Sequence, residues 1–189
     1  MAQDLTSRKR LIAELRQECE GAAAARVDRY LRAKHHGIVA GTLFAPASAE
    51  CINLFRDGHF YGAISLSQAV GEAIVRHMCT SNRWKPSGNF ERNVSKLKLR
   101  RFIDDDIQTR LLQLWERRND YHHLNNDVET DRGKLEQIAF AKIRALATIE
   151  AWVFSYSLAT GGALALRFPQ YWPRTGADPV AVFLRNPTV

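Results

Sequence analysis

Residues 111–123 read LLQLWERRNDYHH, and this stretch decides both the fold and the chemistry that we expect of the chain. Leu111, Leu114 and Trp115 recur at the three- and four-residue spacing of a helix with one buried face. Residues 118–123 then supply a fixed cation, an amide, a carboxylate, a phenol and two imidazoles in succession. No other part of the sequence concentrates so many groups that can bind anions or move protons.

Helical periodicity extends outward from this stretch in both directions. Turn-forming residues such as Asp57-Gly58 and Gly161-Gly162 separate the periodic segments. The segments predicted as helices are residues 4–34, 47–56, 59–80, 89–99, 104–123 and 131–160. This pattern predicts an all-α protein, an antiparallel bundle of four to five main helices.

The segments between and beyond these helices are predicted to be irregular. Residues 38–45 are expected to form a loop or short turn. The proline-rich C-terminal tail, residues 161–189, is expected to be irregular with a short strand at residues 180–184. Three aromatic residues of the tail either stack on bases or anchor the tail on the bundle, namely Phe168, Tyr171 and Trp172.

The composition is that of an ordinary globular protein with an excess of positive charge. The 189 residues are 46% hydrophobic and 25% charged, with a formal net charge of +7 and a pI of about 9.6. Residues 83–101 hold seven basic side chains against Glu91 alone, so much of the excess is local. A basic protein favours an anionic partner, with nucleic acid first and a membrane surface second.

The cysteines and the hydropathy pattern indicate an intracellular protein. Cys19, Cys51 and Cys79 are widely spaced and odd in number, which argues against a disulfide framework. The first residues lack the apolar run of a signal peptide, and no apolar run reaches the length of a membrane span. We therefore expect a cytoplasmic protein without membrane association.

The sequence also argues against several kinds of site. It contains no GxGxxG, P-loop or GxSxG motif. His122 and His123 are adjacent and would point about 100° apart on a helix, which is a poor arrangement for a shared metal ion. No second set of Cys, His or carboxylate residues has metal-ligand spacing. We expect neither a metal ion nor a cofactor.

The polar cluster suits phosphodiester chemistry on RNA. An imidazole can take or give a proton near neutral pH. An arginine keeps its charge, can pair with two phosphate oxygens and stabilises the negative charge that builds during in-line attack. Because RNA carries its own nucleophile, the 2′-hydroxyl, a site with one acid–base group and one cation can cleave RNA without a metal ion.

The segment Arg118-Asn119-Asp120-Tyr121-His122-His123 resembles the signature of the HEPN superfamily, an arginine followed by four to six residues and a histidine. In that signature the arginine is often followed by a polar residue, as Asn119 follows it here. Residues 54–63 and 68–73 are similar to the helix pair that precedes the motif in those proteins. We expect residues 1–189 to form a single domain. The resemblance covers a helical core of residues 47–160 and leaves out two segments, the additional N-terminal helix of residues 1–36 and the tail of residues 161–189.

The resemblance implies a small helical bundle that forms a homodimer, with two motifs facing each other in one composite site. Many HEPN domains are metal-independent ribonucleases, including toxins, antiviral proteins and the nuclease parts of type VI CRISPR effectors. The resemblance therefore implies an endoribonuclease in which Arg118 holds the scissile phosphate and His123 is the general acid or base. A toxin or defence effector of this kind would have RNA as its substrate and an antitoxin or regulatory protein as a further partner. The alternative is a non-catalytic HEPN-like module for RNA binding, nucleotide binding or dimerisation.

Helix geometry leaves the choice of histidine open. On an unbroken helix His123 lies about 140° around from Arg118, whereas His122 lies about 40° away. Asn119 shares a face with His123, four residues further on, and is a candidate site residue with them. Either the helix bends near Tyr121, or Arg118 reaches round, or the pairing is made across the dimer. The family pattern favours His123, and His122 is the second choice.

Residues around the motif have two interpretations each. Glu72 either orients Arg118 or pairs with Arg76 four residues further on. Tyr121 either supports the site or packs in the core. Four cations of the basic segment either guide RNA by phosphate contacts or form a solvated face, and these are Lys96, Lys98, Arg100 and Arg101.

Overall fold

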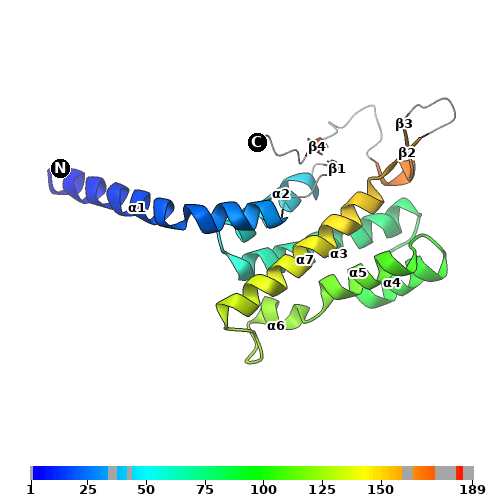
Figure 1. The fold of residues 1–189 in the computed structure, drawn as a ribbon. Coiled ribbons are helices and arrows are strands. Elements are labelled where there is room, and N and C mark those ends of the chain that lie inside the picture. The colour runs from blue at the N-terminus through cyan, green and yellow to red at the C-terminus, as the bar shows by residue number, and fades with distance from the viewer. Residues whose placement is uncertain (1, 34–37, 42–43, 159–163, 173–181, 185–189) are drawn as a thin grey trace.

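The computed structural model describes residues 2–33, 38–41, 44–158, 164–172 and 182–184 (Figure 1). Helices dominate this part of the chain, which confirms the predicted all-α class. The α-helices are α1 (Ala2–Ala33), α2 (Phe44–Arg56), α3 (Phe60–Ser81), α4 (Phe90–Leu99), α5 (Asp105–Trp115), α6 (Arg118–His123) and α7 (Arg132–Val153). The remaining elements are the strands β1 (Ile38–Ala40), β2 (Tyr156–Leu158), β3 (Leu164–Leu166) and β4 (Val182–Leu184) and the 3₁₀ turn η1 (Pro169–Tyr171).

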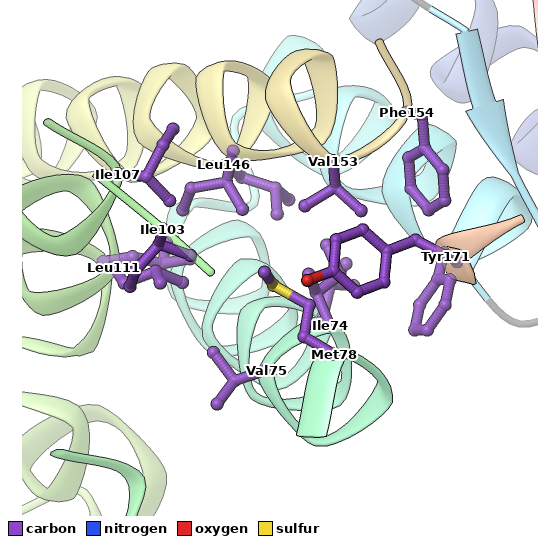
Figure 2. Packing of buried hydrophobic residues seen from close by; sticks show 14 of the residues in the cluster. Ile74, Val75, Met78, Ile103, Ile107, Leu111, Leu146, Val153, Phe154 and Tyr171 are labelled. Carbon is purple, nitrogen blue, oxygen red and sulfur yellow. The ribbon is translucent and has the colours of Figure 1, made fainter. Parts of the chain in front are cut away.

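The bundle is built around α3 and α7, which pack along each other (Figure 1). α2 lies against α3, and α5 packs on α7, so that apolar faces from four helices meet in the interior. Figure 2 shows the Tyr171 ring lying among Ile74, Met78 and Val153. Tyr171 is only 1% exposed, and its hydroxyl accepts a hydrogen bond from Asn82 Nδ2 at 3.0 Å. This residue therefore anchors the segment after β3 on the bundle.

Helix caps mark the start of several helices at the residues that favour them. The carboxylate of Asp104 accepts a hydrogen bond from the N–H of Ile107 at 2.9 Å and begins α5. In the same way, the side-chain oxygen of Asn89 accepts the backbone N–H of Arg92 and begins α4, and that of Asp131 accepts the backbone N–H of Lys134 and begins α7. These local hydrogen bonds explain why the predicted and observed starts of the three helices agree closely.

The helix α1 extends away from the bundle (Figure 1). Its C-terminal third is held by ion pairs, which join Arg26 to Asp57 at 2.6 Å and Arg32 to Glu136 at 2.6 Å. Further toward the N-terminus its apolar side chains have no core to enter, and Leu15 is 59% exposed. The predicted helix is present, but its apolar stripe continues beyond the body of the protein.

The structure corrects two boundaries. The helix predicted for residues 131–160 ends at Val153, and residues 156–158 form β2, which pairs antiparallel with β3. Phe154 and Tyr156 favour extended backbone and pack on Trp172, with ring centroids 5.7 and 5.2 Å away. These contacts with a distant residue end the helix at Val153, several residues before the Gly161-Gly162 pair that the sequence indicated as its end.

The second correction concerns residues 38–45, which were expected to form a loop or turn. Ile38–Ala40 form β1 and pair antiparallel with β4 in the tail, with Ile38 opposite Leu184. The predicted tail strand is therefore present at residues 182–184, and its residues 180 and 181 lie outside the described part of the chain. Within that part, no helix combines the length and apolarity needed to cross a bilayer.

Candidate functional site

The helix predicted over residues 104–123 is broken, and the break lies just before the motif of residues 118–123. α5 ends at Trp115, and Arg117 adopts a left-handed conformation with φ of 57° before α6 begins. On an unbroken helix the motif would continue along the direction of α5. The break instead sets a new direction for α6. It precedes Arg118 and leaves Arg118–His123 on one helix, so the bend near Tyr121 that was one of three alternatives does not occur.

Two side chains from other helices stabilise this break. Lys142 on α7 donates hydrogen bonds through Nζ to the carbonyl oxygens of Gln113 at 2.6 Å and Glu116 at 2.8 Å. Gln68 on α3 donates through Nε2 to the Glu116 carbonyl at 3.2 Å. Carbonyl groups at a helix end have no partner within the helix. The ammonium and the amide therefore complete the end of α5 at the point where the chain turns.

Burial lowers the pKa of Lys142 to about 8. Desolvation of the ammonium is the main cause, and the charge of Glu116 opposes it. The cation lies at the C-terminal end of α5, where the helix dipole favours positive charge. Lys142 is thus a buried cation whose place is defined by backbone oxygens, and its role is to hold the α5–α6 junction.

The motif brings Arg118 and His122 to one side of α6. The pKa of the His122 imidazole is lowered, first by partial desolvation and then by the positive charges of Arg118 and His123. Glu72 and a hydrogen bond to the backbone of Ser65 act in the opposite direction. His122 therefore lies between Arg118 and helix α3. Both histidines are solvent-accessible.

The Arg118 guanidinium is loosely held and partly open to solvent. Its Nη2 lies 4.0 Å from Glu72 Oε2, its Nη1 lies 3.5 Å from Asn119 Oδ1, and its side chain is 31% exposed. The guanidinium lies over the Trp115 ring, 4.8 Å from the centroid. Glu72 makes a closer pair with Arg76, at 2.5 Å. Glu72 thus contacts both arginines, and Arg118 keeps donor groups for an incoming anion.

Tyr121 fixes α6 to the bundle. It is 4% exposed and packs in the smaller core beside Tyr61, with ring centroids 6.3 Å apart. Burial raises the pKa of its phenol, and its hydroxyl has no hydrogen-bond partner within the described residues. On the outer side, Asp120 pairs with Arg117 at 2.8 Å. Tyr121 therefore packs in the core and holds α6 against the bundle.

The four cations expected to bind RNA lie at the other end of α5 from the motif. Phe90 at the start of α4 stacks on Trp115 at 4.1 Å, while Lys98 near its end pairs with Asp105 at 2.7 Å. α4 therefore runs antiparallel to α5, and the two regions are separated by about 15 Å of helix. Lys96 and Arg100 lie over the Trp84 ring at 4.6 and 5.0 Å. One protomer does not bring these cations together with Arg118.

Sequence reasoning missed the residues that hold the junction. Lys142 falls on the inner face of α7, next to Ile143 and one turn after Ala139, where an apolar side chain is the usual choice. A lysine in that register is the signal that would have identified it as a buried cation. Gln68 on α3 has no comparable signal, because its contact with Glu116 spans 48 residues. No group of three or more His, Cys, Asp or Glu residues is placed to hold a metal ion within the described ranges.

Fold and site define an all-α bundle protein with an arginine and two histidines on a short surface helix. Searches against family models, curated proteins and solved structures find no match for this chain.

Proposed function

We propose that this protein is a metal-independent endoribonuclease of the HEPN type. The observation that carries the proposal is the position of Arg118 and His122 on one accessible side of α6, with His123 as the next residue. A guanidinium with unused donors and an imidazole of lowered pKa are the two groups that cleavage by the RNA 2′-hydroxyl requires. A role as a toxin or defence effector in the cytoplasm, controlled by an antitoxin or regulatory protein, follows from the family resemblance.

The proposed reaction is a transfer within the RNA chain. A neutral imidazole takes the proton of the 2′-hydroxyl while the 2′-oxygen attacks the adjacent phosphorus. The bond from phosphorus to the 5′-oxygen breaks, and a protonated imidazole supplies the proton that this oxygen needs. Arg118 pairs with the phosphoryl oxygens and stabilises their added negative charge. The products are a 2′,3′-cyclic phosphate and a 5′-hydroxyl.

Each protomer supplies two histidines, and a dimer offers two ways to use them. His122, four residues after Arg118, lies beside it in the same protomer and suits the role of base, because its lowered pKa keeps it neutral at physiological pH. His123 lies about 140° around the helix from Arg118 and is better placed to approach the arginine of a second copy. A composite site of two protomers would thus contain both a base and an acid.

A non-catalytic RNA-binding, nucleotide-binding or dimerisation module remains the second candidate. The observation that favours it is the carboxylate of Glu72, which lies 4.0 Å from the Arg118 guanidinium and competes with a phosphate for it. Such a module would bind RNA through phosphate contacts with a strong salt dependence and leave the chain intact.

The deciding experiment compares RNA cleavage by the wild type and by Arg118→Ala, His122→Ala and His123→Ala, each with and without EDTA. Cleavage should survive the chelator, produce 2′,3′-cyclic phosphate ends and disappear in Arg118→Ala. Arg110→Ala and His59→Ala are matched controls, because Arg110 is paired with Asp106 at 3.4 Å and His59 is an exposed residue before α3. Intact RNA with the wild type, together with salt-dependent binding, would establish the second candidate instead.

A further inference from the structure

A hollow of about 600 Å³ lies between the end of α4, the turn into α5 and the segment around η1. Its volume is in the range of pockets that hold one small organic ligand. The wall combines arginines with aromatic rings, and the residues that matter for its chemistry are Arg101, Phe102, Trp152, Arg167 and Phe168. This composition differs from that of the motif on α6, which lies at the opposite end of α5.

The positive charge at the hollow is available to a ligand. Within the described residues, neither Arg101 nor Arg167 makes an ion pair with a carboxylate, whereas Lys98 is already paired with Asp105 at 2.7 Å. Asp104 also lines the hollow, but its carboxylate accepts the Ile107 N–H and serves as the cap of α5. Two arginines therefore remain to pair with an anion, and a guanidinium is well suited to phosphate.

The aromatic part of the wall offers an apolar surface beside these cations. Trp152 and Phe168 lie against each other with ring centroids 4.3 Å apart, and both are only partly buried. The Arg167 guanidinium lies over the Phe168 ring, 5.2 Å from its centroid. Phe102 is also partly exposed and is held from behind by Trp84 at 5.2 Å. A flat heteroaromatic ring can pack on such a surface while its charged substituent reaches the arginines.

We propose that this hollow binds a nucleoside phosphate, with the base against Trp152 and Phe168 and the phosphate paired with Arg101 and Arg167. The ligand is either a free mononucleotide or one nucleotide of a single-stranded RNA. Binding here does not require cleavage at α6, because the two regions lie about 15 Å apart along α5. Failure of the ribonuclease proposal would therefore leave this site unaffected.

The chain contains a matched pair of arginines for the test. Arg101 and Arg83 each follow a helix end in the left-handed conformation, with φ of 59° and 61°, and each donates its N–H to a carbonyl three residues earlier. Only Arg101 lines the hollow. Glycine adopts this conformation without strain, so Arg101→Gly and Arg83→Gly should both fold at least as stably as the wild type. Any loss of binding in Arg101→Gly is then separated from loss of structure.

Binding is measured by calorimetry with adenosine and uridine 5′-monophosphates, with inorganic phosphate, and with a 2′-O-methyl RNA hexamer that cannot be cleaved. Arg101→Gly and Arg167→Gln should each weaken nucleotide binding by about tenfold, while Arg83→Gly binds like the wild type. A monophosphate that binds as tightly as the hexamer identifies a free nucleotide as the ligand. A hexamer that binds much more tightly, and is still weakened by both variants, identifies single-stranded RNA.

Three results would overturn the proposal. The first is absence of saturable binding for both the monophosphates and the hexamer. The second is equal affinity of Arg101→Gly, Arg167→Gln and the wild type for the ligand that binds. The third is equal affinity for inorganic phosphate and for the nucleotides, because the aromatic side chains would then contribute nothing to binding.

Discussion

Replacement of Lys142 by methionine tests the structural basis of the α5–α6 junction. Methionine is unbranched and of similar length, so it fills the space of the lysine stem without its charge or its hydrogen bonds. The substitution removes the donors to Gln113 O and Glu116 O. Glu116 O keeps Gln68 Nε2 at 3.2 Å, whereas Gln113 O loses the ammonium at 2.6 Å.

The magnitude follows from two opposing effects. Orphaned carbonyls cost about 1–3 kcal/mol each, and only one of the two is fully deprived. In return, methionine removes the cost of a buried ammonium. That cost is reflected in the lowered pKa of about 8 and amounts to about 2 kcal/mol after solvent screening is allowed for. At neutral pH we therefore expect Lys142→Met to lose no more than about 2 kcal/mol of unfolding free energy.

The pH dependence gives a sharper signature. The folded pKa of Lys142 is about 8, below the ordinary value of 10.5, so between these values the unfolded chain binds more protons than the folded one. The free energy of unfolding must therefore rise with pH in that window. Protonation of Lys142 in the unfolded chain favours unfolding, and this effect weakens as the proton concentration falls. The wild type should gain about 1–2 kcal/mol relative to Lys142→Met between about pH 7 and pH 10.

The assay is urea unfolding of both proteins across this range, followed by circular dichroism. Other titrating groups are common to the two proteins and cancel in the difference between their curves. Parallel stability profiles for the wild type and Lys142→Met would refute the assignment of Lys142 as a buried cation of lowered pKa. RNA cleavage by Lys142→Met should also fall, because the junction that positions Arg118 is released, and Lys142→Arg tests whether a cation alone restores it.

Three further predictions follow from single contacts. If His122 is the base, the cleavage rate should rise with pH through a pKa below 6.5 and be constant above neutral pH, and His122→Ala should lower the rate about 100-fold or more. A rate that still rises steeply above neutral pH would assign the base to another residue. Gly71→Ala should destabilise the fold by about 1–3 kcal/mol in urea unfolding, because the added Cβ would lie 2.3 Å from Leu114 Cδ2. The control Gly21→Ala on exposed α1 adds a Cβ that meets nothing within 4 Å and should raise helicity. Equal effects of the two variants on stability would contradict the close approach of α3 and α5. The pKa of Asp57 is lowered to about 2 by Arg56 and Arg26, so the contribution of this carboxylate to stability is present above pH 3.8 and is lost as the pH falls toward 2. Asp57→Asn should cost about 1 kcal/mol or less of unfolding free energy at neutral pH and speed hydrogen exchange in the last turns of α1. Unchanged exchange would show that these ion pairs do not hold the helix.

Much of the helical architecture could be predicted because its causes are local. The caps Asn89, Asp104 and Asp131 each accept a hydrogen bond from an N–H three residues later, and the helices begin beside them. The end of α7 was missed for the opposite reason. Phe154 and Tyr156 leave the helix to pack on Trp172, and no rule of local spacing contains that contact.

The structure brings some of the candidate site residues together and separates others. Arg118, His122 and Glu72 lie close together, although the family pattern favoured His123 over His122 as the partner of Arg118. The cations Lys98 and Arg101 instead belong to the hollow at the far end of α5. Their separation from Arg118 results from the antiparallel course of α4 and α5, because stacking of Phe90 on Trp115 directs the end of α4 away from α6.

By itself the sequence determined that this protein is helical and that its acid–base groups are concentrated at residues 118–123, because apolar periodicity and residue identity act over a few neighbouring positions. Only the tertiary structure decided where the helix before the motif stops. That break depends on Lys142 and Gln68, which reach the Glu116 carbonyl from 26 and 48 residues away. The tertiary structure also decided that residues 38–40 form a strand. A strand needs a partner for its backbone hydrogen bonds, and the strand that ends at Leu184 provides it from a distant part of the chain.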